Sequence, residues 1–115
     1  MIDFACKQFN LDDIIKCGFS LTKTEFKIMR YFLKNTNKEC MTISISKKMD
    51  LNLTTVQKAV KKLSEKNIII RHQKNLSNGG YVYTYECNSK KNIRRIIKEI
   101  IKNWSEKVEK KIDKW

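Results

Sequence analysis

Residues 52–67 read NLTTVQKAVKKLSEKN, and residues 68–86, IIIRHQKNLSNGGYVYTYE, follow them directly. In the first part, apolar residues recur at the spacing of one buried helix face: Val56, Ala59, Val60 and Leu63. In the second part, β-branched and aromatic residues flank a polar segment containing two glycines, which predicts two antiparallel strands joined by a turn. A helix that leads directly into a two-stranded ribbon is typical of a recognition helix and its wing.

The opposite face of this helix carries side chains that suit a DNA groove. Threonine and glutamine can exchange hydrogen bonds with base edges, a leucine or a threonine methyl can touch a thymine methyl, and lysines reach phosphates. An ordinary solvated face is the alternative, because lysine-rich surfaces are common. The predicted DNA-binding set includes a helix cap and comprises Asn52, Leu53, Thr54, Thr55, Gln57, Lys58, Lys61 and Lys62.

The segment between the two strands, residues 74–80, is rich in residues that tolerate positive φ, as a hairpin tip requires. A basic tip can follow phosphates or enter a minor groove, whereas a plain hairpin that covers the core is the alternative. We interpret Tyr81, Tyr83 and Tyr85 as packing residues rather than as stacking platforms for bases. The predicted wing contacts are Arg71, His72, Lys74, Asn75, Ser77 and Asn78.

Upstream, Thr22 and Glu25 form an S/T-x-x-E capping box that predicts the start of a helix. A brief strand at Met41-Thr42, a short helix over 43–49 and a turn over 50–52 are expected to complete a helix-turn-helix. In such a motif the first helix crosses the DNA backbone. The predicted phosphate contacts are therefore Ser44, Lys47 and Lys48, although both lysines could equally be solvated.

The last segment, residues 89–115, contains neither Gly nor Pro and predicts one long helix that begins at Ser89. At about 1.5 Å per residue it spans roughly 35 to 40 Å, which is too long to be buried by a small domain alone. We expect one edge to pack on its own domain and the other on a second copy, although its basic first half could instead be a nucleic-acid arm. The predicted dimerisation residues are Ile93, Ile97, Ile100, Trp104, Val108, Ile112 and Trp115.

Composition limits the class of protein. A chain of 115 residues makes one domain with a modest core, and its formal charge of +13 favours polyanionic partners without proving DNA binding. No apolar run is long enough for a membrane span or a signal peptide, and no segment pairs a basic face with free apolar bulk. We therefore expect a cytoplasmic, nucleoid-associated protein with no membrane partner.

The residues that could hold a metal or perform catalysis are sparse. Cys6, Cys17, Cys40 and Cys87 lie too far apart for C-x-x-C ligand pairs, and His72 is the single histidine. We interpret the cysteines as small buried residues, with redox control by a disulfide or an intersubunit pair as the alternative. No Ser/His/Asp set, phosphate-cradling loop or paired acid motif is present. We expect no enzyme activity, metal, cofactor or small-molecule ligand.

The predicted organisation has three parts. Residues 1–20 form an N-terminal helical extension, in which a helix over 11–17 ends at Gly18 and extends the core or the dimer contact. Residues 21–88 form a winged helix-turn-helix domain, and residues 89–115 form the dimerisation helix. The predicted fold class is mainly α with a small β-hairpin.

Three stretches resemble archaeal TrmB-like winged-helix transcriptional regulators, within the wider MarR-like group. They are residues 17–25 at the entry to the first helix, residues 53–60 in the recognition helix and residues 79–83 at the return of the wing. The resemblance implies base contacts at Thr54, Thr55, Gln57 and Lys58, and dimerisation through the terminal helix. The chain ends without the C-terminal effector-binding domain of the longer family members, so sugar sensing is not implied.

These observations predict a homodimeric, sequence-specific regulator of transcription that binds double-stranded DNA, with repression by occlusion as the simplest mechanism. Two alternatives stay open. A sequence-tolerant architectural chromatin protein would bind with an affinity that depends on salt and hardly on sequence. A winged-helix protein-interaction module of a transcription assembly would keep its DNA affinity after Gln57→Ala with Lys58→Ala.

Overall fold

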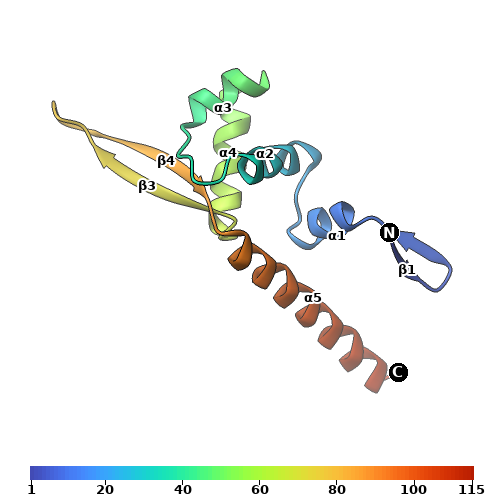
Figure 1. The fold of residues 1–115 in the computed structure, drawn as a ribbon. Coiled ribbons are helices and arrows are strands. Elements are labelled where there is room, and N and C mark those ends of the chain that lie inside the picture. The colour runs from blue at the N-terminus through green and yellow to red at the C-terminus, as the bar shows by residue number, and fades with distance from the viewer.

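The computed structural model describes residues 1–115 as five helices and two small antiparallel hairpins (Figure 1). The β3–β4 ribbon and α5 extend from the α2–α4 body in different directions, so the molecule is elongated, at 63 × 25 × 24 Å. The elements in chain order are β1 (Ile2–Phe4), β2 (Lys7–Phe9), α1 (Leu11–Gly18), α2 (Lys23–Lys34), α3 (Thr42–Met49), α4 (Leu53–Glu65), β3 (Ile69–Asn75), β4 (Tyr81–Cys87) and α5 (Lys90–Asp113).

The core lies between α2, α3, α4 and the base of the β3–β4 ribbon. Helix α4 packs against both α2 and α3, and its four predicted apolar residues are all buried. This confirms the helical face inferred from their spacing. The side chains that fill the rest of the core come mainly from the other helices and the start of the ribbon: Phe19, Ile28, Met29, Phe32, Ile45, Ile68 and Ile69.

Three helix starts predicted from the sequence are confirmed by their hydrogen bonds. In the capping box of α2, the Thr22 amide donates to Glu25 Oε1 at 2.8 Å and the Glu25 amide donates to Thr22 Oγ1 at 3.2 Å. Asn52 Oδ1 caps α4, and Ser89 Oγ caps α5. These caps satisfy amides that have no partner inside the helix, which fixes where each helix begins.

The extended residue that precedes α3 is Cys40, not the predicted pair Met41-Thr42. Cys40 bridges to Tyr85 at the free edge of β4 through two backbone hydrogen bonds of 2.8 Å. Met41 is the cap of α3, and Thr42 is already helical. The extended residue is Cys40 and not Met41 because the Cys40 side chain faces the core, whereas that of Met41 is exposed.

The sequence predicted a helical N-terminal extension, but the extension is only partly helical. Residues 2–9 form the β1–β2 hairpin, with Ile2 opposite Phe9, and Ala5 adopts positive φ in its turn. The short apolar pattern there does not distinguish a strand from a helix. The helix predicted over 11–17 is present as α1 and includes Gly18, while Ser20 provides the left-handed residue that follows it.

Helix α5 has two halves with different surroundings. Ile93 is buried at 3% exposure, and Ile96, Ile97 and Ile100 pack against the same core. The assignment of Ile93 to a dimer contact is therefore wrong, because its own domain covers it completely. The four later members of that predicted set are exposed: Trp104, Val108, Ile112 and Trp115. No helix of the chain has the length and apolar character needed to cross a membrane.

Candidate nucleic-acid interface

The turn between α3 and α4 consists of Asp50, Leu51 and Asn52 and is fixed by local bonds. Asp50 adopts the left-handed conformation at φ 52°, the Leu51 amide donates to the Ser46 carbonyl at 3.0 Å, and Ser46 Oγ donates to the Leu51 carbonyl at 2.6 Å. Asn52 then caps α4. Sequence reasoning had not singled out Ser46, because a serine on a short helix gives no local sign of such a bond. The bonds set the angle at which α4 leaves α3.

The outer face of α4 is polar and exposed along its first three turns. Leu53 is 37% exposed at the start of the helix and is followed by exposed threonine, glutamine and lysine side chains. No acidic residue occurs in α4 before Glu65. The positive end of the helix dipole also points outward at Asn52, which favours an anion there. The residues that share this exposed face are Leu53, Thr54, Thr55, Gln57, Lys58 and Lys61.

Lys62 lies on α4 but does not belong to that free face. Its Nζ donates to Glu25 Oε1 at 3.0 Å and also to the Ser20 carbonyl. Partial burial raises the pKa of the Glu25 carboxyl, but the hydrogen bonds from Thr22 and Lys62 outweigh burial, and the net pKa lies below its usual range. Lys62 therefore ties α4 to α2, and the prediction that it contacts DNA is wrong for this arrangement.

The backbone contacts predicted on α3 are all exposed. Ser44, Lys47 and Lys48 face solvent, and neither lysine forms an ion pair within the chain. They lie on the helix that immediately precedes α4 and its fixed turn. These positions leave both lysines free to meet an anion or to remain solvated.

The tip of the β3–β4 ribbon is a glycine turn without acidic residues. Gly79 and Gly80 adopt φ of 91° and 80°, which other residues rarely tolerate, and the Leu76 amide donates to the Gly80 carbonyl at 3.0 Å. Strand β3 extends to Asn75, so the tip is shorter than the predicted segment 74–80. Asn75, Ser77 and Asn78 are exposed there, as a contact with another molecule requires.

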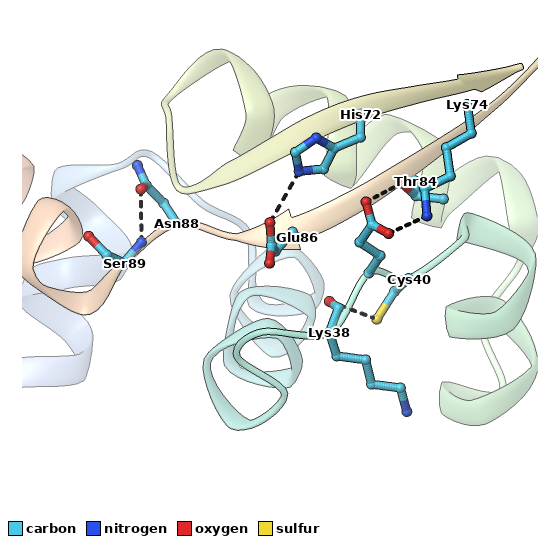
Figure 2. A network of polar contacts seen from close by, with 9 residues as sticks. Lys38, Cys40, His72, Lys74, Thr84, Glu86, Asn88 and Ser89 are labelled. Carbon is cyan, nitrogen blue, oxygen red and sulfur yellow. Dashed lines mark hydrogen bonds and ion pairs between the residues drawn. The ribbon is translucent and has the colours of Figure 1, made fainter.

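Two other predicted wing contacts on β3 are paired with acidic side chains (Figure 2). Lys74 Nζ pairs with Glu39 Oε2, while Thr84 Oγ1 donates to Glu39 Oε1 at 3.2 Å. His72 Nε2 lies 3.1 Å from Glu86 Oε1. The hydrogen bond from Lys74 lowers the pKa of the Glu39 carboxyl. Lys74 thus braces the ribbon against the α2–α3 connection, whereas His72 is bonded across the ribbon to Glu86 of β4.

Arg71 and the three tyrosines occupy the other face of the ribbon. The Arg71 guanidinium lies 4.4 Å from the centre of the Tyr83 ring, and Tyr81 meets Tyr83 edge-on. Tyr85 packs against the core, as predicted. Tyr81 is exposed and packs edge-on against Tyr83 along the ribbon, so it is a packing residue outside the core.

All four cysteines are free thiols. Cys40 and Cys87 are buried, and burial raises the pKa of the Cys87 thiol, which makes it a poor nucleophile. Cys6 and Cys17 are exposed, contrary to the prediction that all four are buried. No three His, Cys, Asp or Glu side chains gather closely enough to hold a metal ion.

Comparison with known proteins identifies the family. Residues 9–110 match the family model of the DnaD N-terminal domain. The chain belongs to this family. Two uncharacterized proteins of Methanocaldococcus jannaschii are similar to this chain, at 27% identity over 108 residues and 29% identity over 104 residues. These matches cover 94% and 90% of this chain and 80% and 84% of the relatives.

Two solved structures share the fold of this DnaD N-terminal domain chain. A protein of Methanosarcina mazei, described as a "possible transcriptional regulator", is 44% identical and superimposes with a TM-score of 0.92 over 100% of this chain and 96% of its own. The ST1889 protein of Sulfolobus tokodaii is 21% identical, with a TM-score of 0.67 over 84% of this chain and 92% of its own. The second likeness concerns the fold alone.

Proposed function

We propose that the chain is a transcriptional regulator that binds double-stranded DNA through a winged helix-turn-helix formed by α2, α3, α4 and the β3–β4 ribbon. The observation that carries this proposal is the outer face of α4, which is polar, exposed and free of acids, and is held at a fixed angle by the Asp50–Asn52 turn. The description of the M. mazei relative supports the same role.

In the proposed complex, α4 enters the major groove with its capped end first. Thr54, Thr55 and Gln57 are placed to meet base edges, while Lys58 and Lys61, farther along the same face, reach phosphates. The TrmB-like resemblance implies base contact at Thr54, Thr55 and Gln57, and it adds Lys58 to that set. The ribbon tip then contacts flanking backbone or the minor groove through Asn75, Ser77 and Asn78.

We further propose that the active form is a homodimer. The chain exposes 8772 Å², whereas a compact monomer of this mass exposes about 6,600 Å². The excess coincides with apolar side chains that nothing in the chain covers, and a second copy that packs against them would remove this area from water. They lie at the N-terminus and from Ile101 to the end of the chain: Met1, Ile2, Phe4, Leu11, Ile101, Trp104, Val108, Ile112 and Trp115.

A symmetric dimer presents two α4 helices to successive major grooves about one helical turn apart. Repression by occlusion is the simplest outcome of such binding. The proposal includes no enzymatic activity, cofactor or small-molecule ligand. Mapping of the bound site relative to the promoter tests the sign of regulation, because a site upstream of the polymerase footprint with rising transcription indicates activation instead.

The deciding experiment is selection of genomic fragments by the purified protein at about 150 mM salt, where screening weakens purely electrostatic binding. A recovered inverted repeat is the expected result. The double variant Thr55→Ala with Gln57→Ala should lose preference for that repeat by about ten- to a hundredfold, because it removes two base contacts. The matched control is Thr36→Ala with Gln8→Ala, since these exposed polar residues lie outside α4 and the ribbon.

Two other outcomes would replace the proposal. Tight binding without a shared motif would make the chain an architectural chromatin protein, a role that its formal charge of +13 favours. Absence of binding would leave a protein-interaction module.

A further inference from the structure

The first half of α5 carries a row of cations that the proposed DNA interface does not use. Five exposed basic side chains surround a shallow concavity on this helix, together with one acid, Glu99, and no hydrophobic residue. We call this row the α5 basic stripe, and it consists of Lys91, Arg94, Arg95, Lys98 and Lys102.

The stripe faces away from the part of α5 that packs on the body. At about 100° per residue, Lys91, Arg95, Lys98 and Lys102 fall on one side of the helix, and Ile93 and Ile100 fall on the opposite side. Trp104 continues the isoleucine side toward the C-terminus. Ile101 and Val108 of the proposed dimer contact lie roughly 90–110° around the helix from the centre of these four cations, so a contact through them leaves the four cations accessible.

The cations of the stripe are not neutralised within the chain. None of the four ion pairs of the molecule involves α5. Lys91 and Arg95, and likewise Lys98 and Lys102, stand four residues apart, so like charges face each other on adjacent turns and disfavour the helix. A bound polyanion would relieve this repulsion.

The chemistry of the stripe favours phosphates over a protein partner. A protein interface has an apolar centre, whereas the concavity on α5 has no hydrophobic lining. The stripe is about 16 Å long from Lys91 to Lys102, a length of duplex that carries about ten phosphate charges. No threonine, glutamine or asparagine lines the concavity, and lysine and arginine are the side chains that most often contact the phosphate backbone.

We propose that the α5 basic stripe binds the sugar-phosphate backbone of a second duplex segment, distinct from the segment read by α4. This inference rests on the proposed function for the first segment. Figure 1 shows α5 leaving the body on the side away from α3 and the ribbon tip, so one straight duplex lying against α4 and the tip does not also follow α5. The protein would then hold two stretches of DNA together without sequence preference at the second.

The test uses two duplexes of unrelated sequence, one attached to beads and one fluorescent in solution. The full-length protein should retain the fluorescent duplex on the beads at low salt. The variant Lys91→Gln, Arg95→Gln, Lys98→Gln, Lys102→Gln should lose most of this retention. The magnitude of the log–log slope of second-duplex capture against salt concentration should also fall by about 3.6, because four phosphate contacts are removed.

The matched control removes the same charge from the other half of α5: Lys107→Gln, Lys110→Gln, Lys111→Gln and Lys114→Gln. It should retain the second duplex nearly as well as the natural chain. The stripe variant should melt at the same or a higher temperature, because it loses repulsion and no packing. A loss of capture is therefore not a loss of folding.

Three results would overturn the inference. They are no capture by the natural chain, capture that survives the stripe variant, and equal loss in the stripe variant and its control. The variant Thr55→Ala with Gln57→Ala separates the two proposals, because it should lose sequence selection while the stripe still captures DNA. If the natural chain shows no sequence selection at all, the proposed function fails, and the effect of the stripe variant still decides the second site.

Discussion

Helices α4 and α5 are both rich in lysine, but they differ in how the chain covers their apolar sides. Helix α4 has 13 residues and buries four of them, whereas α5 has 24 residues and buries only Ile93. The apolar face of α4 is therefore fully covered within one chain, whereas most of the apolar face of α5 is not. This difference explains why one helix contributes to the stability of the monomer and why we assign the other to contacts with other molecules.

The largest expected effect comes from breaking the core side of α4. Leu63 is fully buried, so Leu63→Ala removes buried methyl groups and leaves a cavity. The free energy of unfolding should fall by about 2–5 kcal/mol, measured by urea denaturation. Lys61→Ala, two residues earlier on the exposed side, should change it by less than about 0.5 kcal/mol. Equal effects would mean that α4 is not packed as described.

The corresponding change in α5 should affect assembly instead of folding. Trp104 is 65% exposed, so Trp104→Glu places a charge on the proposed contact between copies without disturbing the monomer core. We expect the dissociation constant of the dimer, measured by sedimentation, to rise by at least tenfold. The helical circular dichroism of the α2–α4 body should be retained. Lys107→Glu, an exposed change of larger charge on the same half of α5, should leave the dimer intact. A natural chain that sediments as a monomer at all concentrations would contradict the dimer.

A smaller effect should come from the ion pair that joins α4 to α2. Glu25→Gln keeps an acceptor for the Thr22 amide but removes the charge that faces Lys62, so it should cost about 0.5–1 kcal/mol at neutral pH. The folded pKa of Glu25 lies below its ordinary value of 4.5, so this stabilisation is complete above pH 4.5 and is lost as the pH falls through the folded pKa.

The free energies of unfolding of the natural chain and the Glu25→Gln variant should therefore converge as the pH is lowered from neutral through the folded pKa of Glu25. Lys62→Met should remove the same pH-dependent contribution while keeping the length of the side chain. A constant difference between the natural chain and the Glu25→Gln variant at every pH would show that the ion pair does not stabilise the junction.

The smallest expected effect tests how closely α1 approaches α5. A Cβ on Gly18 would lie 3.4 Å from Ile100 Cγ2, which is an ordinary contact, and Gly18 is helical. Gly18→Ala should therefore be neutral or raise stability by up to about 1 kcal/mol, because alanine favours the helix. Gly18→Val, which is bulkier at the same place, should lower the melting temperature. A similar loss for both variants would show that α1 and α5 lie closer than this distance.

The local elements were largely predictable from the sequence because short-range chemistry determines them. The capping box of Thr22 and Glu25, the Asn52 cap and the glycine turn of the ribbon depend on neighbours within a few residues. The buried face of α4 follows from a single periodicity. The β1–β2 hairpin escaped prediction because its strands have three residues each, too few for a pattern.

The long-range partners of charged side chains were not predictable. Lys62 and Lys61 look alike in the sequence, but Lys62 meets Glu25, 37 residues away. Lys74 meets Glu39, 35 residues away, in the connection before α3. Such pairs depend on how elements pack, and no spacing within a helix or a strand encodes them. Because Lys62 and Lys74 form these pairs, we do not include them in the candidate interface.

Propensity, capping and periodicity act locally, so they predicted most of the helical segments, the starts of α2, α4 and α5, and the apolar side of α4. Tertiary packing established which cations are free, which half of α5 its own domain covers and where Cys40 joins the edge of β4. These features depend on contacts between residues that are distant in sequence, and only the packed chain brings those residues together.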